Sequence, residues 1–262
     1  MKTGDANVVT AGFFALGLAV GSFGTLVGIG GGIFLVPIFI LGLGWGPEQA
    51  VGTSLMVVFL NALSGTLAYV RQKKIYYQAA YWFSAATFPG AVLGSYLVHY
   101  FSGSGFKLAF GSLLVCLGVL MFVRSRLAAP HAEHTTTNFP YNRSLGIAVS
   151  AVVGFLSSIL GIGGGVIHVP AMIYMLGFPA HIATATSHFV LALSTLFGVV
   201  SHLLLDNVVL AVAIPLGIGA VLGAQLGAKW SLKVKSKAIT TLLAFSLFAL
   251  GVRLVATAWF GQ

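Results

Sequence analysis

The feature that most constrains the fold is a series of long apolar runs with almost no charged residues. They lie near residues 8–27, 49–70, 76–100, 107–123, 144–160, 181–205, 207–228 and 236–252. As α-helices, runs of about 17–25 residues cross a bilayer core of about 30 Å. Polar and apolar residues do not alternate along them, so they do not fit the strands of a transmembrane β-barrel. The sequence therefore predicts an all-α polytopic membrane protein.

The same five-residue segment, GIGGG, interrupts two of these apolar regions. It occupies residues 28–32 and 161–165, and shorter apolar runs follow it near residues 32–44 and 165–176. Twelve or thirteen helical residues span roughly 20 Å, which is too short for a full crossing. Since glycine weakens a helix and permits positive φ, we expect each segment to break the helix. The short run after it would then be half of a re-entrant hairpin.

The two GIGGG segments belong to a longer internal repeat. Residues 28–54 align with residues 161–187 without a gap at an offset of 133, and share VP and TS pairs as well as the glycines. The segment GAVLG at 90–94 recurs at 219–223, where the offset is 129. The polar stretch between the halves defines three regions. These are a first transmembrane repeat (1–126), a cytoplasmic linker (127–142) and a second transmembrane repeat (143–262).

Charged residues indicate how the repeats lie in the membrane, because cytoplasmic loops carry an excess of Lys and Arg. Ten of the 13 basic residues form clusters: Arg71, Lys73 and Lys74; Arg124, Arg126 and Arg143; and Lys229, Lys233, Lys235 and Lys237. With these inside, Asp5, Glu48 and Asp206 lie outside. The loops that follow runs 49–70 and 181–205 then lie on opposite sides of the membrane. This predicts two inverted repeats, each a re-entrant glycine-broken hairpin plus three transmembrane helices.

The net charge of +9 does not indicate a nucleic-acid partner. Lys and Arg stand at the ends of apolar runs, where they face acidic lipid headgroups, so the expected partner is the lipid bilayer. The sequence contains no GxxxxGK[ST] phosphate loop, no HExxH and no paired carboxylates. We therefore predict no enzymatic activity, no catalytic residues, no cofactor and no metal site.

Glycine-broken helices at membrane depth are suited to bind an anion. A helix that restarts exposes N–H groups and the positive end of its dipole, and glycine lets an anion approach the backbone. The candidates are the N–H groups of residues 31–34 and 164–167. For a single GIGGG, close helix packing is the simpler explanation. Its second copy in an inverted half favours a binding site near the midplane, made from both copies.

Hydroxyl and amide side chains follow each glycine segment. Thr53-Ser54 and Thr186-Ser187 begin the next apolar runs, where their hydroxyls could donate to an anion or bond carbonyls of their own helix. Asn61 lies two turns after Ser54 and could bind the ligand or tie helices together. These side chains could therefore either bind the ligand or form hydrogen bonds within and between helices, and both interpretations stay open.

His188 directly follows Ser187. It could bind the substrate, carry a coupling proton or join helices. No Asp or Glu lies deep in any run, which argues against a carboxylate proton relay or a carboxylate-based sodium site. The predicted substrate-binding set is Gly28, Gly30, Gly31, Gly32, Thr53, Ser54, Asn61, Gly161, Gly163, Gly164, Gly165, Thr186, Ser187 and His188.

The pattern GxxxGIGGGxxxVP followed by A-x-x-T-S, with its second copy GIGGGxxxVPxMxxxG…ATATS, resembles the TauE/SafE (sulfite exporter) family of bacterial membrane transporters. The resemblance implies a multi-pass protein of the bacterial cytoplasmic membrane. It implies an alternating-access transporter of a small anion, with sulfite or an organosulfonate first and thiosulfate or a small carboxylate as alternatives. A passive anion channel with the glycines as its filter is the alternative mechanism.

The functional positions that the resemblance implies are confined to the two motif copies. The motif positions are Gly28–Gly32 with Pro37, Thr53 and Ser54, and Gly161–Gly165 with Pro170, Thr186 and Ser187. His168 and His188 stand where the first half has Leu35 and Leu55. A role for either histidine is therefore suggested by this sequence and not by the family.

Overall fold

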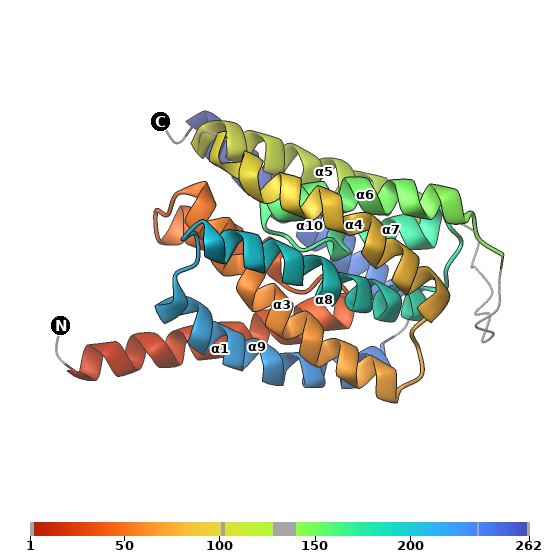
Figure 1. Cartoon of the computed structure of the whole chain (residues 1–262), viewed down its shortest axis with the longest axis horizontal. Coiled ribbons are helices and arrows are strands. Elements are labelled where there is room, and N and C mark those ends of the chain that lie inside the picture. The colour runs from red at the N-terminus through yellow and green to blue at the C-terminus, as the bar shows by residue number, and fades with distance from the viewer. Residues whose placement is uncertain (1–2, 101–102, 128–139, 235, 261–262) are drawn as a thin grey trace.

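A computed structural model describes residues 3–100, 103–127, 140–234 and 236–260, and within these ranges the secondary structure is helical (Figure 1). The elements are α1 (Thr3–Val27), α2 (Gly32–Pro37), the π-helical η1 (Ile38–Gly42), α3 (Pro47–Arg71), α4 (Tyr77–Leu97), the 3₁₀ turn η2 (Val98–Tyr100), α5 (Gly103–Leu127), α6 (Arg143–Leu160), α7 (Gly165–Tyr174), α8 (Ala180–Leu204), α9 (Leu210–Ser231) and α10 (Ser236–Phe260). Most of the predicted linker, 127–142, lies outside the described residues.

Seven of the described helices are long and apolar enough to cross a membrane: α1, α3, α5, α6, α8, α9 and α10. They confirm most of the predicted full-length runs. α4 occupies another predicted run but does not meet the same criterion, because its 21 residues include several Tyr, Ser and Thr. The two short helices after the glycine segments also lie where the sequence predicts them. The chain is therefore an all-helical, multi-pass membrane protein.

Helices of the two halves pair in equivalent ways. α1 packs along α9, α6 packs along α4, and α5 packs on α10, while α3 and α8 lie together in the middle (Figure 1). Adding 133 to the bounds of α3 gives those of α8. The backbone of Asn207, just after α8, approaches Gly52 near the start of α3. α3 and α8 thus run antiparallel, and the loops that follow them lie at opposite ends of the bundle.

The offset of 133 continues through α4 and α9, so the predicted change to 129 is wrong. A Cβ on Gly90 would meet the backbone of Ala151 and Phe155, and a Cβ on Gly223 would meet the backbone 133 positions earlier. Gly90 is therefore equivalent to Gly223 and not to Gly219. Glycines recur every four residues along α9, so a sequence match displaced by one helical turn looks equally good.

Both GIGGG segments break the helix, as predicted. The chain then turns back towards the preceding helix, since the rings of Phe23 in α1 and Phe34 in α2 lie 5.3 Å apart. In the second half, the ring of His168 in α7 lies within hydrogen-bond distance of Ser150 in α6, at 2.9 Å. The orientation of the two halves relative to the membrane stays a prediction.

Candidate functional site

The two GIGGG segments lie against each other in the interior of the bundle. A Cβ on Gly32 would come within 2.6 Å of the carbonyl oxygen of Gly161. A Cβ on Gly165 would overlap the carbonyl oxygen of Gly28 in the equivalent way. The two breaks can make this contact only because neither position has a side chain. The structure thus brings the eight predicted glycines close together.

The backbone differs between the two breaks. Gly31, before α2, has a φ of +86°, a left-handed conformation that strongly favours glycine. Its equivalent Gly164, before α7, has a φ of −52° and is right-handed. The two identical sequences therefore adopt two related but distinct conformations, which the sequence alone does not indicate.

Several buried N–H groups at the breaks have no hydrogen-bond acceptor. Among the described residues, no acceptor is present for the N–H groups of residues 31–33 or of residues 164–166. The N–H groups of Phe34 and Ile167 donate to carbonyls three residues earlier. The predicted donors, 31–34 and 164–167, are thus reduced to the first three of each. The first N–H groups of a helix normally lack an acceptor within the helix and are solvated or capped. Here two such sets are buried close together, where unpaired N–H groups are rarely found.

Ser54 and Ser187 connect each half to the glycine break of the other half. The Oγ of Ser54 donates to the carbonyl of Gly161 at 2.9 Å. The Oγ of Ser187 donates to the carbonyl of Gly28 at 3.4 Å. Both predicted serines are therefore at the contact between the two breaks.

Thr53 and Thr186 hold the start of a helix in the opposite half. The N–H of Val209, just before α9, donates to Thr53 Oγ1 at 3.0 Å. The N–H of Tyr76, just before α4, donates to Thr186 Oγ1 at 2.9 Å. Each hydroxyl accepts in these bonds, so each still has its own O–H to donate.

We expect Thr53→Val and Thr186→Val each to lower the free energy of unfolding by about 1 kcal/mol, the usual loss when a helix-start cap is removed. Thermal unfolding of the purified protein in detergent measures the change. Thr195→Val is the matched control, since its buried hydroxyl donates to the carbonyl of Leu191 in its own helix and to no other described residue. A control as destabilised as the two cap variants would contradict the capping role.

Asn61 joins three helices. Its Nδ2 donates to the carbonyls of Gly21 in α1 at 3.0 Å and Ala220 in α9 at 3.1 Å. Its Oδ1 accepts from the hydroxyl of Thr25 at 3.0 Å. Ser194, its equivalent in the second half, has a buried Oγ without a partner among the described residues. In this conformation the amide of Asn61 therefore bonds protein groups.

His188 is fully buried between α1, α3 and the first glycine break. Its Nε2 lies 3.2 Å from the Oγ1 of Thr25. Its ring faces the carbonyl of Gly28, and its Nδ1 has no hydrogen-bond partner among the described residues. The structure therefore places His188 at the edge of the paired breaks.

Two apolar residues that were not predicted from the sequence, Val58 and Leu191, cover both breaks. A Cβ on Gly30 would lie 2.6 Å from Leu191 and 2.9 Å from Val58. A Cβ on Gly163 would lie 2.6 Å from each of the same two side chains. Val58 and Leu191 are related by the offset of 133, and this relation was the feature of the sequence that could have identified them. Apolar residues in apolar helices do not otherwise stand out.

Two buried threonines at the first break were also missed. The hydroxyl of Thr25 lies between Asn61 and His188. The side chain of Thr184 packs against Gly28, and its Oγ1 has no partner among the described residues. A hydroxyl in a helix usually bonds its own backbone, so sequence alone gave no reason to select these two.

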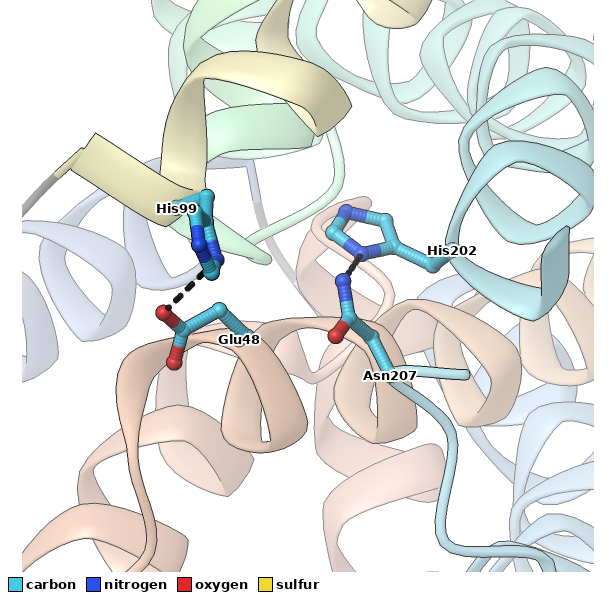
Figure 2. A network of polar contacts seen from close by, with 4 residues as sticks. All are labelled: Glu48, His99, His202 and Asn207. Carbon is cyan, nitrogen blue, oxygen red and sulfur yellow. Dashed lines mark hydrogen bonds and ion pairs between the residues drawn. The ribbon is translucent and has the colours of Figure 1, made fainter. Parts of the chain in front are cut away.

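A separate set of polar side chains, from Glu48, His99, His202 and Asn207, lies at one end of the bundle (Figure 2). Nδ1 of His99 is 3.5 Å from the carboxylate of Glu48, and Nδ2 of Asn207 is 3.3 Å from Nδ1 of His202. The side chain of His99 is 80% exposed, so its pairing with Glu48 contributes little to the stability of the protein. Figure 2 shows the start of α3 beside the loop after α8, where the N–H of Val209 donates to Thr53, at the end predicted to lie outside.

Comparison with known proteins gives matches over most of the chain. The family model described as Sulfite exporter TauE/SafE matches residues 13–254. The probable membrane transporter protein YunE of Bacillus subtilis is 33% identical, over 92% of this chain and 95% of its own. Probable membrane transporter proteins of Methanocaldococcus jannaschii (MJ0441) and Escherichia coli (YfcA) are 29% and 23% identical, over 90% and 88% of this chain and 92% and 83% of theirs. No solved structure matches the chain significantly.

Proposed function

The chain belongs to the Sulfite exporter TauE/SafE family, and from this premise we propose that it is a secondary transporter of a small anion. The family and its relatives identify it as a membrane transporter, and transport is favoured over catalysis. The proposed substrate is sulfite or an organosulfonate, with thiosulfate or a small carboxylate as alternatives. The proposed route crosses the bacterial cytoplasmic membrane.

The observation that carries the proposal is the set of six buried N–H groups, at residues 31–33 and 164–166, that find no acceptor in the part of the chain that the structure describes. They belong to two breaks that touch each other, so one oxyanion could receive donors from both. Such donors suit an anion at membrane depth, where a fixed Lys or Arg would be costly to bury. The oxygen atoms of sulfite or a sulfonate would accept from several N–H groups at once.

The predicted hydroxyls extend this donor set. Thr53 and Thr186 each retain an O–H that can donate, because their hydroxyls accept from N–H groups. Ser54 and Ser187 donate to carbonyls of the breaks, and could rotate towards a bound anion. Asn61 contributes through the helices it holds, and His188 through its position beside Gly28.

Equivalent packing in the two halves supports an alternating-access mechanism. The antiparallel α3 and α8, together with the paired hairpins, fit two repeats that are inverted in the membrane. Val58 and Leu191 lie against both breaks and would act as an apolar seal over them. Movement of one half against the other would uncover the breaks from one side at a time.

Uptake into proteoliposomes tests the proposal. We expect saturable uptake of radiolabelled sulfite, sulfoacetate or thiosulfate, stimulated by unlabelled substrate inside the vesicles, with acetate as the carboxylate comparison. A channel would instead give large currents without counterflow. In detergent, an anion at 100 times its Kd should raise the apparent stability by about 2.7 kcal/mol. No uptake and no stabilisation with any of these anions would contradict the proposal.

A further inference from the structure

We propose that His188 is the proton-binding group that couples anion transport to proton movement. This inference rests on the proposed function, since it assigns a coupling ion to the same site. It starts from one unpaired atom: the Nδ1 of a fully buried histidine next to the paired glycine breaks. The hydrogen bonds around the ring decide which protons it carries.

Asn61 fixes the direction of those hydrogen bonds. Its Nδ2 donates to the carbonyls of Gly21 and Ala220, so its Oδ1 must face Thr25. The single O–H of Thr25 donates to that Oδ1. The oxygen of Thr25 can then only accept from His188, whose Nε2 lies 3.2 Å away.

Neutral His188 therefore carries its proton on Nε2, and its Nδ1 has a free lone pair. The ring faces the carbonyl of Gly28, which cannot donate to that lone pair. This explains why Nδ1 has no partner among the described residues. A proton taken up by Nδ1 would create an N–H that can donate to the Gly28 carbonyl or to an anion bound at the breaks. The uptake is a simple protonation, which converts imidazole into imidazolium.

The surroundings of His188 make such a proton the main source of positive charge near the breaks. α1 contributes Thr25, and α3 contributes Gly65 packed on the ring and Tyr69, whose ring centroid lies 5.6 Å away. Tyr69 is the titratable group whose ring packs on His188, and no carboxylate forms an ion pair with His188 among the described residues. An anion would therefore favour protonation of His188, and protonation would favour the anion, by the same factor.

Only one of the two repeats contains the residues that this coupling requires. The equivalent of His188 in the first half is Leu55, which packs near Gly198 as His188 packs near Gly65. The equivalent of Asn61 is Ser194, which has no partner among the described residues. The second position therefore lacks both the titratable ring and the bonds that would orient it. We expect one proton for each transport cycle.

The test measures anion and proton movement together in proteoliposomes that contain a pH-sensitive dye. With wild-type protein, a sulfoacetate gradient should drive proton movement in the same direction as the anion. His188→Gln keeps an N–H that can donate to Thr25 but cannot bind a proton. We expect this variant to show reduced sulfoacetate counterflow, because it lacks the donor that a protonated Nδ1 offers to the anion, and to lose proton movement and the pH dependence of the uptake that remains. His99→Gln is the control, since the side chain of His99 is 80% exposed at one end of the bundle, and it should remain coupled.

The outcomes separate this inference from the proposed function. Sulfoacetate uptake without proton movement in wild type, or proton movement retained in His188→Gln, would overturn the coupling role but leave anion transport intact. If His188→Gln does not fold, Thr25→Val removes the acceptor for Nε2–H instead. That variant should stay coupled and shift the pH of half-maximal uptake, and an unshifted profile would overturn the inference. If wild type transports no anion, the proposed function itself fails.

Discussion

Replacing Gly165 by alanine is expected to push the two glycine breaks apart and to destabilise the protein. The added Cβ would overlap the carbonyl of Gly28, which belongs to the backbone and cannot rotate away. Gly32→Ala would press on the carbonyl of Gly161 in the same way, at 2.6 Å. Overpacking of this kind typically costs about 1–3 kcal/mol. We expect both variants to show a lower apparent unfolding temperature in detergent and to lose transport.

Gly12→Ala provides the control, because a Cβ at this helical position has nothing within 4 Å. Alanine is there favoured over glycine by about 1 kcal/mol, so the control should be neutral or slightly stabilised. Wild-type stability of Gly165→Ala would contradict the direct contact between the breaks. An acidic substitution at Gly165 is a poorer probe of anion repulsion, since its Cβ disturbs the packing before its charge acts.

The second large effect is expected for Asn61→Leu, which removes three hydrogen bonds at once. The carbonyls of Gly21 and Ala220 and the hydroxyl of Thr25 would lose a partner in a buried place. Interhelical hydrogen bonds in membranes contribute less than one might expect, but unsatisfied buried groups add to their loss. We estimate a destabilisation of about 2–3 kcal/mol. Thermal unfolding in detergent measures it.

Ser194→Ala is the matched variant at the equivalent position of the second half. Since the Oγ of Ser194 has no partner among the described residues, its removal should change stability by less than about 0.5 kcal/mol. Equal destabilisation of the two variants would contradict the proposed difference, in which Asn61 forms three interhelical hydrogen bonds and Ser194 forms none among the described residues. A pronounced loss of substrate affinity in Asn61→Leu without loss of stability would instead make Asn61 a direct ligand.

Most helices and both breaks could be predicted from the sequence, because the bilayer makes length and apolarity decisive. GIGGG was recognisable because glycine is unfavourable in a helix, and its second copy showed that the break recurs. The match of GAVLG at an offset of 129 failed for a related reason. Small residues recur every four positions along packed helices, so local identity does not define the register. Only the contacts of Gly90 and Gly223 distinguish the correct pairing.

The candidate site could be predicted only in part. Gly28 to Gly32 and Gly161 to Gly165 do lie together, as do Ser54 and Ser187. Val58 and Leu191 carry no chemical signal, so their position over the breaks emerged only when α3 and α8 were placed. Thr25 escaped notice because a threonine in a helix has many possible partners.

By itself, the sequence determined that this chain lies in a membrane, that it repeats, and that each half contains a broken helix. Those properties follow from composition and spacing along one chain. The tertiary structure decided which backbone carbonyl faces which glycine, and which atom of His188 carries the proton. These depend on hydrogen bonds between residues as far apart as Thr25 and His188. A donor or acceptor becomes defined only when all its neighbours are in place.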